Sequence, residues 1–201
     1  EDADHSDEIE DAHEDAALDM KLKTFSYDLK YNLAKMGKFE TIVGLQGMYQ
    51  ENQNFGEEIL IPDAITNDIG FLVTSIFDIN DLSSLQGGIR FDHRNLSSSS
   101  YEKEGPNMDS QEITIDGVDR TFSNFTFSLG YKNVFFEKIT SRINIASGFR
   151  APNLAELTSF GVHHGSNRFE IGNPDLDSEQ NFQFDLSLEY GNRHFEVFAN
   201  G

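Results

Sequence analysis

The sequence contains no cysteine and no tryptophan, and its basic residues are few. Without cysteine, the chain can form neither a disulfide framework nor a thiolate metal site. No run of apolar residues reaches the roughly 18 that a transmembrane helix requires. The 15 basic residues face 35 acidic ones, which gives a formal net charge of -20. This excess repels nucleic acid and attracts cations, so nucleic acid is excluded as a partner.

The first residues lack the pattern of a signal peptide, which needs a basic start followed by an apolar stretch. Residues 1–17 read EDADHSDEIEDAHEDAA and are almost entirely acidic or small. We interpret this segment as an acidic, histidine-containing extracellular loop, with a solvated flexible segment as the simpler alternative. We expect the chain to be a piece of a larger polypeptide.

What the sequence does contain is a repeated alternation of polar and apolar residues, which uses many of its 18 phenylalanines. In residues 24–34, for example, Phe25, Tyr27 and Leu29 share one face of a strand, and polar residues occupy the other. A period of two is typical of β-strands. The same period predicts strands over residues 24–34, 39–50, 68–79, 85–94, 123–133, 140–150, 181–190 and from 194 onward.

The connections between these strands are alternately short and long. Short turns are predicted at residues 34–38, 80–82, 136–138 and 191–193, whereas residues 51–64, 97–120 and 151–180 form long connections. No helix is needed anywhere. Strict alternation of this kind is unusual in soluble sandwiches and typical of outer-membrane barrels, which have short periplasmic turns and long extracellular loops.

The polar faces of the predicted strands also favour a barrel with a wet interior. Arg90, Asp92, Arg142 and Asn144 would be costly in a dry core unless each were paired. A water-filled or plugged lumen accommodates them, while the apolar face contacts lipid. Because no water reaches backbone groups in hydrocarbon, an antiparallel sheet in a membrane must close on itself.

Two sequence blocks carry a resemblance to a known family. Residues 147–157 read SGFRAPNLAEL, and residues 170–190 begin EIGNPDLDSE. The first contains a G-[FY]-R-A-P pattern and the second a G-N-P-x-L-x-x-E pattern, and the two lie in order between alternating strands. Together they resemble the C-terminal barrel signature of TonB-dependent outer-membrane receptors. The matching residues are Gly148, Phe149, Arg150, Ala151, Pro152, Gly172, Asn173, Pro174, Leu176 and Glu179.

This resemblance implies an all-β fold, an antiparallel transmembrane β-barrel of 22 strands plugged by an N-terminal domain. Residues 1–201 would then be a partial barrel domain with about eight strands and without the plug. It further implies the outer membrane of a Gram-negative bacterium, contact with membrane lipid, and energy supplied by a TonB complex that binds an N-terminal part outside this chain. The signature residues themselves have an architectural interpretation, because Pro152 ends a strand and Gly172 to Pro174 reverse the chain.

Histidines and carboxylates make metal the predicted cargo. His163 and His164 lie between glycines in the middle of the longest loop, and His5 and His13 lie in the acidic segment. His93 is placed at the end of its strand, on the same side as that loop. Neutral imidazole and carboxylate are ligands for zinc and other divalent metals. A segment rich in histidine and carboxylates resembles the extracellular loops of the zinc-uptake branch of TonB-dependent receptors.

Each of these histidines also has a simpler interpretation. His5 and His13 fit no tight ligand spacing, and His93 could be a polar residue of the barrel rim. Adjacent residues of an extended chain point in opposite directions, so His163 and His164 would bind one ion together only at a sharp bend.

The sequence therefore predicts an importer of a metal ion or metal complex, with zinc favoured as cargo and no resident cofactor. A siderophore receptor is one alternative, although a negative entrance disfavours an anionic ferric chelate. The other is a self-contained eight-stranded barrel, closed by its first and last strands, that acts as a surface binding or structural module. We do not expect an enzyme, because no nucleophile, phosphate-binding or metalloprotease motif appears.

Overall fold

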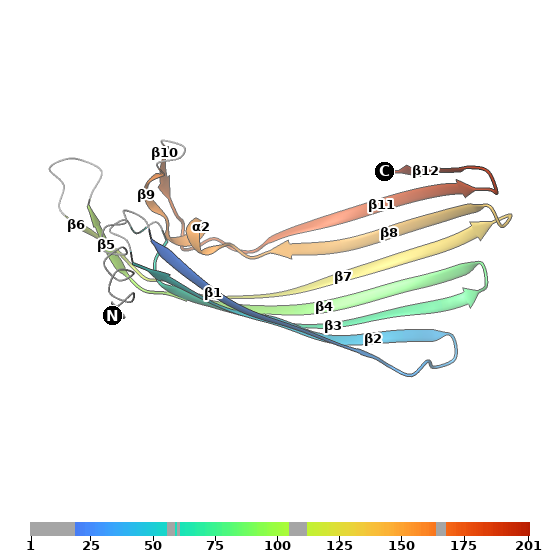
Figure 1. The fold of residues 1–201 in the computed structure, drawn as a ribbon, viewed down its shortest axis with the longest axis horizontal. Coiled ribbons are helices and arrows are strands. Elements are labelled where there is room, and N and C mark those ends of the chain that lie inside the picture. Colours follow the sequence, from blue (N-terminus) through green and yellow to red (C-terminus); the bar gives the residue numbers. More distant parts are fainter. Residues whose placement is uncertain (1–18, 56–58, 60, 105–111, 164–167) are drawn as a thin grey trace, which may run out of the picture.

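The computed structural model describes residues 19–55, 59, 61–104, 112–163 and 168–201, and most of them belong to one antiparallel sheet. The eight strands lie in the order β1-β2-β3-β4-β7-β8-β11-β12, as Figure 1 shows. Their bounds are β1 Met20–Asn32, β2 Phe39–Asn54, β3 Ala64–Asn80, β4 Ser83–Ser98, β7 Asp119–Phe135, β8 Ile139–Arg150, β11 Glu179–Gly191 and β12 Glu196–Asn200. The eight predicted strands are confirmed.

The short turns and the long loops are gathered at opposite ends of the sheet (Figure 1). At the loop end, the long connections contain two small hairpins and one helical turn. These elements are β5 Tyr101–Glu104 with β6 Glu112–Ile115, β9 Phe160–His163 with β10 Arg168–Ile171, and α2 Leu154–Thr158. The sequence analysis required no helix, and the structure adds the five-residue helix α2 to an otherwise all-β fold. None of the described residues forms a helix with the length and apolarity needed to cross a membrane.

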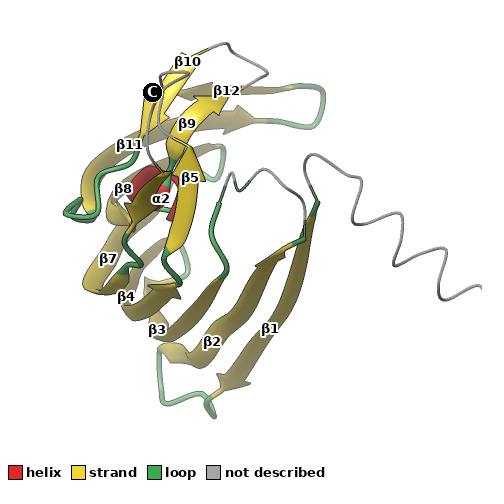
Figure 2. Ribbon diagram, turned by 90° about the vertical axis from the view of Figure 1, so that its left-hand side faces the viewer, coloured by secondary structure: helices red, strands yellow, loops and turns green. Residues whose placement is uncertain are grey.

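The sheet is open. Strands β1 and β12 occupy its two edges and are not paired with each other, and the sheet curves as a section of a barrel wall (Figure 2). The alternative of a self-contained eight-stranded barrel, closed by its first and last strands, is therefore wrong. A section of a larger barrel wall was the other expectation, and the open sheet agrees with it.

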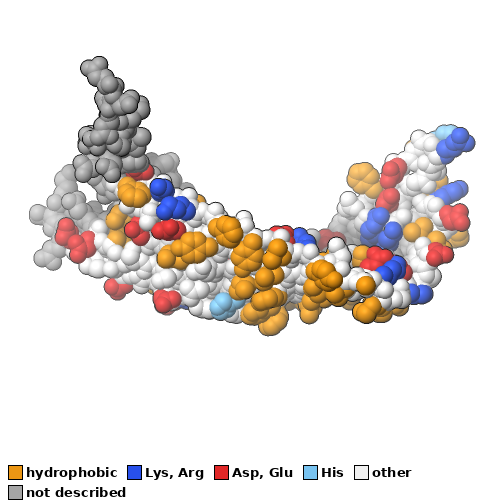
Figure 3. Space-filling model, turned by 60° about the horizontal axis from the view of Figure 1, so that its bottom comes forward, with side chains coloured by type: hydrophobic (Ala, Val, Ile, Leu, Met, Phe, Trp, Pro, Cys, Tyr) orange, Lys and Arg blue, Asp and Glu red, His pale blue; other side chains and the backbone are white. Residues whose placement is uncertain are grey.

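The two faces of the sheet differ as the alternation predicts. One face carries rows of apolar side chains from neighbouring strands, such as Phe71 opposite Phe91 and Phe91 opposite Phe125. These residues are not buried in a core, because Phe71 is 52% and Phe127 44% exposed. Figure 3 shows hydrophobic side chains across the middle of the molecule, with charged ones toward its ends. A lipid environment makes a continuous exposed apolar surface of this kind favourable.

The buried core is small and lies at the loop end of the sheet. Its members are Leu96, Val118, Phe122, Ala151 and Leu157, with Phe149, Leu154 and Leu176 packed against them. Leu96 and Phe122 have the strand parity of the polar face, so this cluster lies on the inner side of the wall. The helix α2 thus packs inside the curve of the wall, as Figure 2 shows.

Candidate functional site

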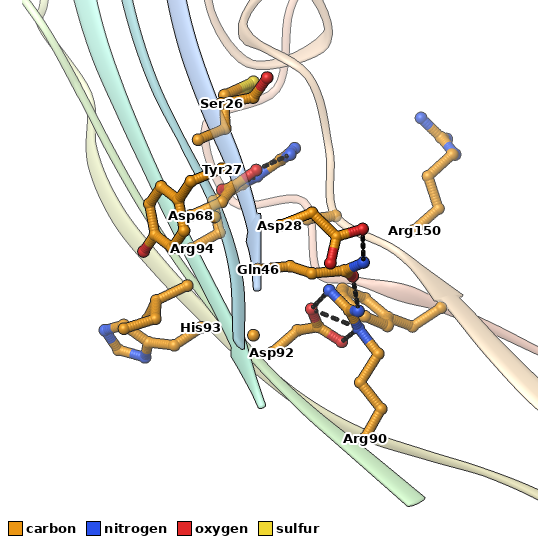
Figure 4. A pocket seen from close by; sticks show the side chains of 16 residues that line it. Ser26, Tyr27, Asp28, Gln46, Asp68, Arg90, Asp92, His93, Arg94 and Arg150 are labelled. Atoms are coloured by element: carbon orange, nitrogen blue, oxygen red, sulfur yellow. Dashed lines mark hydrogen bonds and ion pairs between the residues drawn. The ribbon is translucent and has the colours of Figure 1, made fainter. Parts of the chain in front are cut away.

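The inner face of the wall contains a polar pocket of about 690 Å³. Its lining comes mainly from strands β1 to β4, with residues from the loop end of β8 (Figure 4). Arg90, Asp92 and Arg94 share one strand parity on β4, so their side chains all reach the inner face. The alternation that puts phenylalanine on the outer face of the wall therefore also places these charges inside it.

Two arginine–aspartate pairs form the centre of this pocket. The Nε atom of Arg90 donates to Asp92 Oδ1 and Oδ2 at 2.8 and 2.7 Å. Arg94 binds Asp68 in a bidentate manner, with Nε–Oδ1 and Nη2–Oδ2 distances of 2.7 Å. Asp68 lies directly opposite Arg94 in the register of β3 and β4. Bidentate charge-assisted pairs hold both side chains in fixed positions, so the pocket wall is preorganised and electrically balanced.

A chain of hydrogen bonds extends this network toward β1. Gln46 accepts a hydrogen bond from Arg90 and donates one to Asp28 Oδ2 at 2.9 Å. Asp28 also accepts from Lys30 Nζ at 2.8 Å. The backbone of Gly70 lies beneath the network, and a Cβ atom there would be only 2.6 Å from Asp92 Oδ1. Glycine at position 70 is therefore what gives the Arg90–Asp92 pair its room.

Arg150 connects the two blocks of the sequence signature. Its Nη1 atom donates to Glu156 Oε2 at 2.7 Å and its Nη2 atom to Glu179 Oε1 at 2.9 Å. This three-residue clasp joins the end of β8, the helix α2 and the beginning of β11. The hydrogen bond from Arg150, together with one from the backbone N–H of Asn153, holds the pKa of Glu156 below its usual value. Glu156 therefore stays ionised and completes the clasp at neutral pH.

The helical turn and the following chain reversal fit closely against each other. Asn153 caps α2 in a capping box with Glu156. The amide of Gly172 donates to Ser159 O at 2.6 Å, and that of Asn173 donates to Glu156 O at 2.8 Å. These contacts give the signature residues intramolecular partners, as the architectural interpretation requires.

On the other side of the reversal, Arg120 of β7 binds the carbonyl oxygens of Pro174 and Leu176. The chain reversal is therefore tied to α2 on one side and to the sheet on the other. Sequence reasoning missed these contacts because they join residues far apart in the chain, although the Asn153-x-x-Glu156 spacing signals the cap.

Of the five predicted metal ligands, only His93 has a described side chain. His93 lies within β4, with the strand parity of Ile89 and Phe91, and its Nδ1 atom is 2.8 Å from Ser123 Oγ. It faces outward, away from the Arg90–Asp92 pair (Figure 4). His163 ends β9, and its side chain is outside the described set, as are the whole of His164, His5 and His13.

No group of three or more histidine, aspartate or glutamate side chains suited to a metal ion occurs among the residues whose positions are described. The metal ligands stay a prediction.

The formal charges are distributed unevenly along the sequence. The segments that precede β1 or connect strands at the loop end are residues 1–19, 55–63, 99–118 and 151–178. They contain 22 of the 35 acidic residues and 2 of the 15 basic ones. The strands and short turns hold the other 13 acidic and 13 basic residues, whose charges cancel. The whole net charge of -20 is therefore carried, in the sequence, by the segments outside the eight strands and their short turns.

An open antiparallel wall with a lipid-facing apolar surface, a polar inner surface and segregated turns and loops defines a section of an outer-membrane β-barrel. The family described as TonB dependent receptor-like, beta-barrel matches residues 10–200. The chain belongs to this family, which places it in the outer membrane of a Gram-negative bacterium. The predicted family, the antiparallel all-β barrel fold and the outer-membrane location are confirmed, whereas the zinc-uptake branch stays a prediction.

Solved structures of the same fold share little sequence with this chain. The copper transporter OprC has 15% identity and a TM-score of 0.74 over 90% of this chain. The Serratia marcescens hemophore receptor HasR, solved with its hemophore HasA and heme, has 15% identity and a TM-score of 0.69 over 90% of the chain. The ferric yersiniabactin uptake receptor FyuA from Yersinia pestis has 12% identity and a TM-score of 0.62, again over 90%.

The matched region is 30%, 32% and 28% of these three proteins, so the chain spans about a third of their length. No curated protein matches the chain.

Proposed function

We propose that this chain forms part of the wall of a TonB-dependent importer that carries a metal ion or a metal complex across the outer membrane. The observation that supports this proposal is the difference between the two faces of the sheet in a member of this family. The outer face is apolar and suited to lipid, and the inner face is polar with balanced charges. Such a wall encloses a wet lumen, and its function is passage rather than catalysis. Energy would come from a TonB complex that contacts another part of the receptor.

The charge distribution supports a cationic cargo, with zinc as the favoured ion. A net charge of -20 in the loop-end segments attracts divalent cations and repels anionic chelates. Screening limits this attraction to about 8 Å at physiological ionic strength, so it acts at the loops themselves. His163 and His164 lie in one of these segments and supply the imidazole ligands that zinc prefers.

A ferric siderophore complex is the second candidate cargo. Proteins of the same fold carry names that refer to copper, to heme with a hemophore, and to ferric yersiniabactin. An anionic chelate would need unpaired cations along its path. On the inner wall, however, Arg90 and Arg94 each have an aspartate partner, which weakens this alternative relative to a cation.

The test uses the complete receptor in its own membrane. Zinc binding by calorimetry and uptake of radioactive zinc by cells would be compared between the native receptor and the double variant His163→Ala/His164→Ala. We expect micromolar or tighter zinc binding that the double variant weakens. His194→Ala is the matched control, because His194 is exposed at the turn end of the sheet and its loss should change neither result.

Unchanged zinc binding in the double variant would exclude His163 and His164 as zinc ligands. Uptake of a ferric chelate without uptake of zinc would contradict zinc as the cargo and support a ferric siderophore complex instead.

A further inference from the structure

Each short turn of the wall presents at least one large apolar side chain to the surroundings. The turns are residues 33–38, 81–82, 136–138 and 192–195. We call the most exposed apolar side chain of each turn, taken together, the hairpin-tip row, which consists of Met36, Leu82, Phe136 and Phe195. Tips of turns in water are normally polar, because nothing is gained by exposing apolar surface there. Four consecutive turns with the same exception require a common cause.

Phe136 is the most informative member of the row because its backbone is strained. Phe136 and Glu137 have φ angles of 51° and 59°, and Lys138 N donates to Phe135 O at 3.1 Å. Two left-handed residues in a two-residue hairpin turn favour asparagine followed by glycine. A bulky aromatic residue is a genuine outlier in this conformation. Phe136 is 87% exposed and occupies a backbone conformation that disfavours phenylalanine.

The row is continuous with the lipid-facing surface of the wall. Phe135, which precedes Phe136, has the strand parity of the apolar face and is itself exposed. The rings of Tyr190 and Phe195 lie 5.8 Å apart, which connects the last turn to the apolar end of β11. An apolar tip that extends an apolar surface has the same natural neighbour as that surface, which is lipid.

The charges of the turns indicate which region of the bilayer the hairpin-tip row contacts. The four turns contain the basic residues Lys35, Lys38, Lys138 and Arg193 and only two acidic residues. One of the four, Lys35, pairs with Glu40 at 2.6 Å. Basic side chains beside exposed aromatic rings are typical of the headgroup region, where phosphates attract cations and rings enter the acyl boundary.

We infer that the hairpin-tip row is a phospholipid-contacting surface, with Phe136 inserted at the headgroup boundary on the short-turn side of the membrane. The contact anchors the turns at a fixed depth in the membrane. Its favourable free energy offsets the backbone strain at Phe136. It depends on the membrane location of the wall and not on the cargo, so it can fail while import succeeds, and the reverse.

The experiment places a fluorescent reporter at the tip. The complete receptor carrying Phe136→Trp would be reconstituted in phosphatidylcholine vesicles with and without bromine atoms on the upper part of the acyl chains. The emission added by the new tryptophan should fall markedly in the brominated vesicles and be little affected by acrylamide in water. A second variant, Asp175→Trp, places the ring in the loop-end reversal and should give the opposite result.

Emission from Phe136→Trp that acrylamide quenches and brominated lipid does not would overturn the inference, because the tip would then face water or a protein. Phe136→Asn provides a second measurement that does not depend on tryptophan. Asparagine tolerates the left-handed backbone, so this variant folds without the strain. It should detach more readily from the interface, seen as faster hydrogen exchange at residues 135–139 in vesicles, and slower or equal exchange would contradict the proposal.

Discussion

Replacement of Gly172 by alanine should loosen the loop end of the wall without changing its strands. A Cβ atom at this position would lie 2.7 Å from Leu157 C and from Thr158 N, and 2.8 Å from Leu157 O. All three atoms belong to the backbone of α2, which cannot rotate away as a side chain would. The added methyl group must therefore push the helical turn and the chain reversal apart.

The size of this effect follows from what the displacement breaks. Forcing an extra carbon into a packed site costs about 1–3 kcal/mol. The same shift stretches the hydrogen bonds from Gly172 N to Ser159 O and from Asn173 N to Glu156 O, each worth about 1 kcal/mol. We expect a loss of roughly 2–4 kcal/mol in the local stability of the α2 region.

Hydrogen exchange of the complete receptor measures this loss directly. Amides of residues 154–159 and of Gly172, Asn173, Asp175 and Leu176 should exchange much faster in Gly172→Ala, whereas those of β3 and β4 should be unchanged. Gly191→Ala is the matched control, because no atom lies within 4 Å of a Cβ at that position. Equal exchange in the two variants would refute the close packing between the reversal and the helix.

Three further predictions concern the core, the outer face and the clasp. Leu157→Ala, at a side chain that is 2% exposed, should lower the stability of the loop end by about 2–5 kcal/mol, measured by urea unfolding; a change below the error of that method would contradict its core role. Ile89→Lys should destabilise the folded receptor by about 2–4 kcal/mol in vesicles, whereas Gln86→Lys on the inner face should cost little, and equal costs would refute the assignment of faces. The pKa of Glu156 is lowered in the folded state, so its contribution is complete above the unfolded value near 4.3 and is lost as pH falls through the lower folded value. Glu156→Gln should therefore be less stable than the native protein at neutral pH and equal to it in strong acid, and a difference that stays constant with pH would exclude the clasp.

The strands could be predicted from the sequence because a period of two follows directly from backbone geometry. Phe25, Tyr27 and Leu29 had to share a face once that segment was extended. The structure continues β2 to Asn54, beyond the predicted end at residue 50, because residues 51–54 are all polar and show no alternation, while their hydrogen-bonded pairing with β1 goes on. When the last residues of a strand are polar on both faces, their sequence cannot be distinguished from that of a loop.

The inner network and the clasp could not be predicted in the same way. Asp68 meets Arg94, and Arg150 meets Glu179, through strand registers that periodicity does not determine. His93 shows the opposite case. Its parity with Ile89 and Phe91 is readable from the sequence and already indicates the outward face, so its assignment to a metal site beside the long loop had less support than the pattern offered.

One measurement tests the two-faced wall most directly. Single spin labels introduced at successive positions from Leu85 to Arg94 in the complete receptor, reconstituted in vesicles, would report collisions with oxygen, which concentrates in lipid, and with a water-soluble nickel complex. This stretch of β4 should give an accessibility that alternates with every residue: oxygen dominates at the positions of Ile89 and Phe91, and nickel dominates at those of Arg90 and Asp92. A profile without that alternation, or one in which the apolar positions are shielded from both reagents, would contradict a wall that separates lipid from a wet lumen.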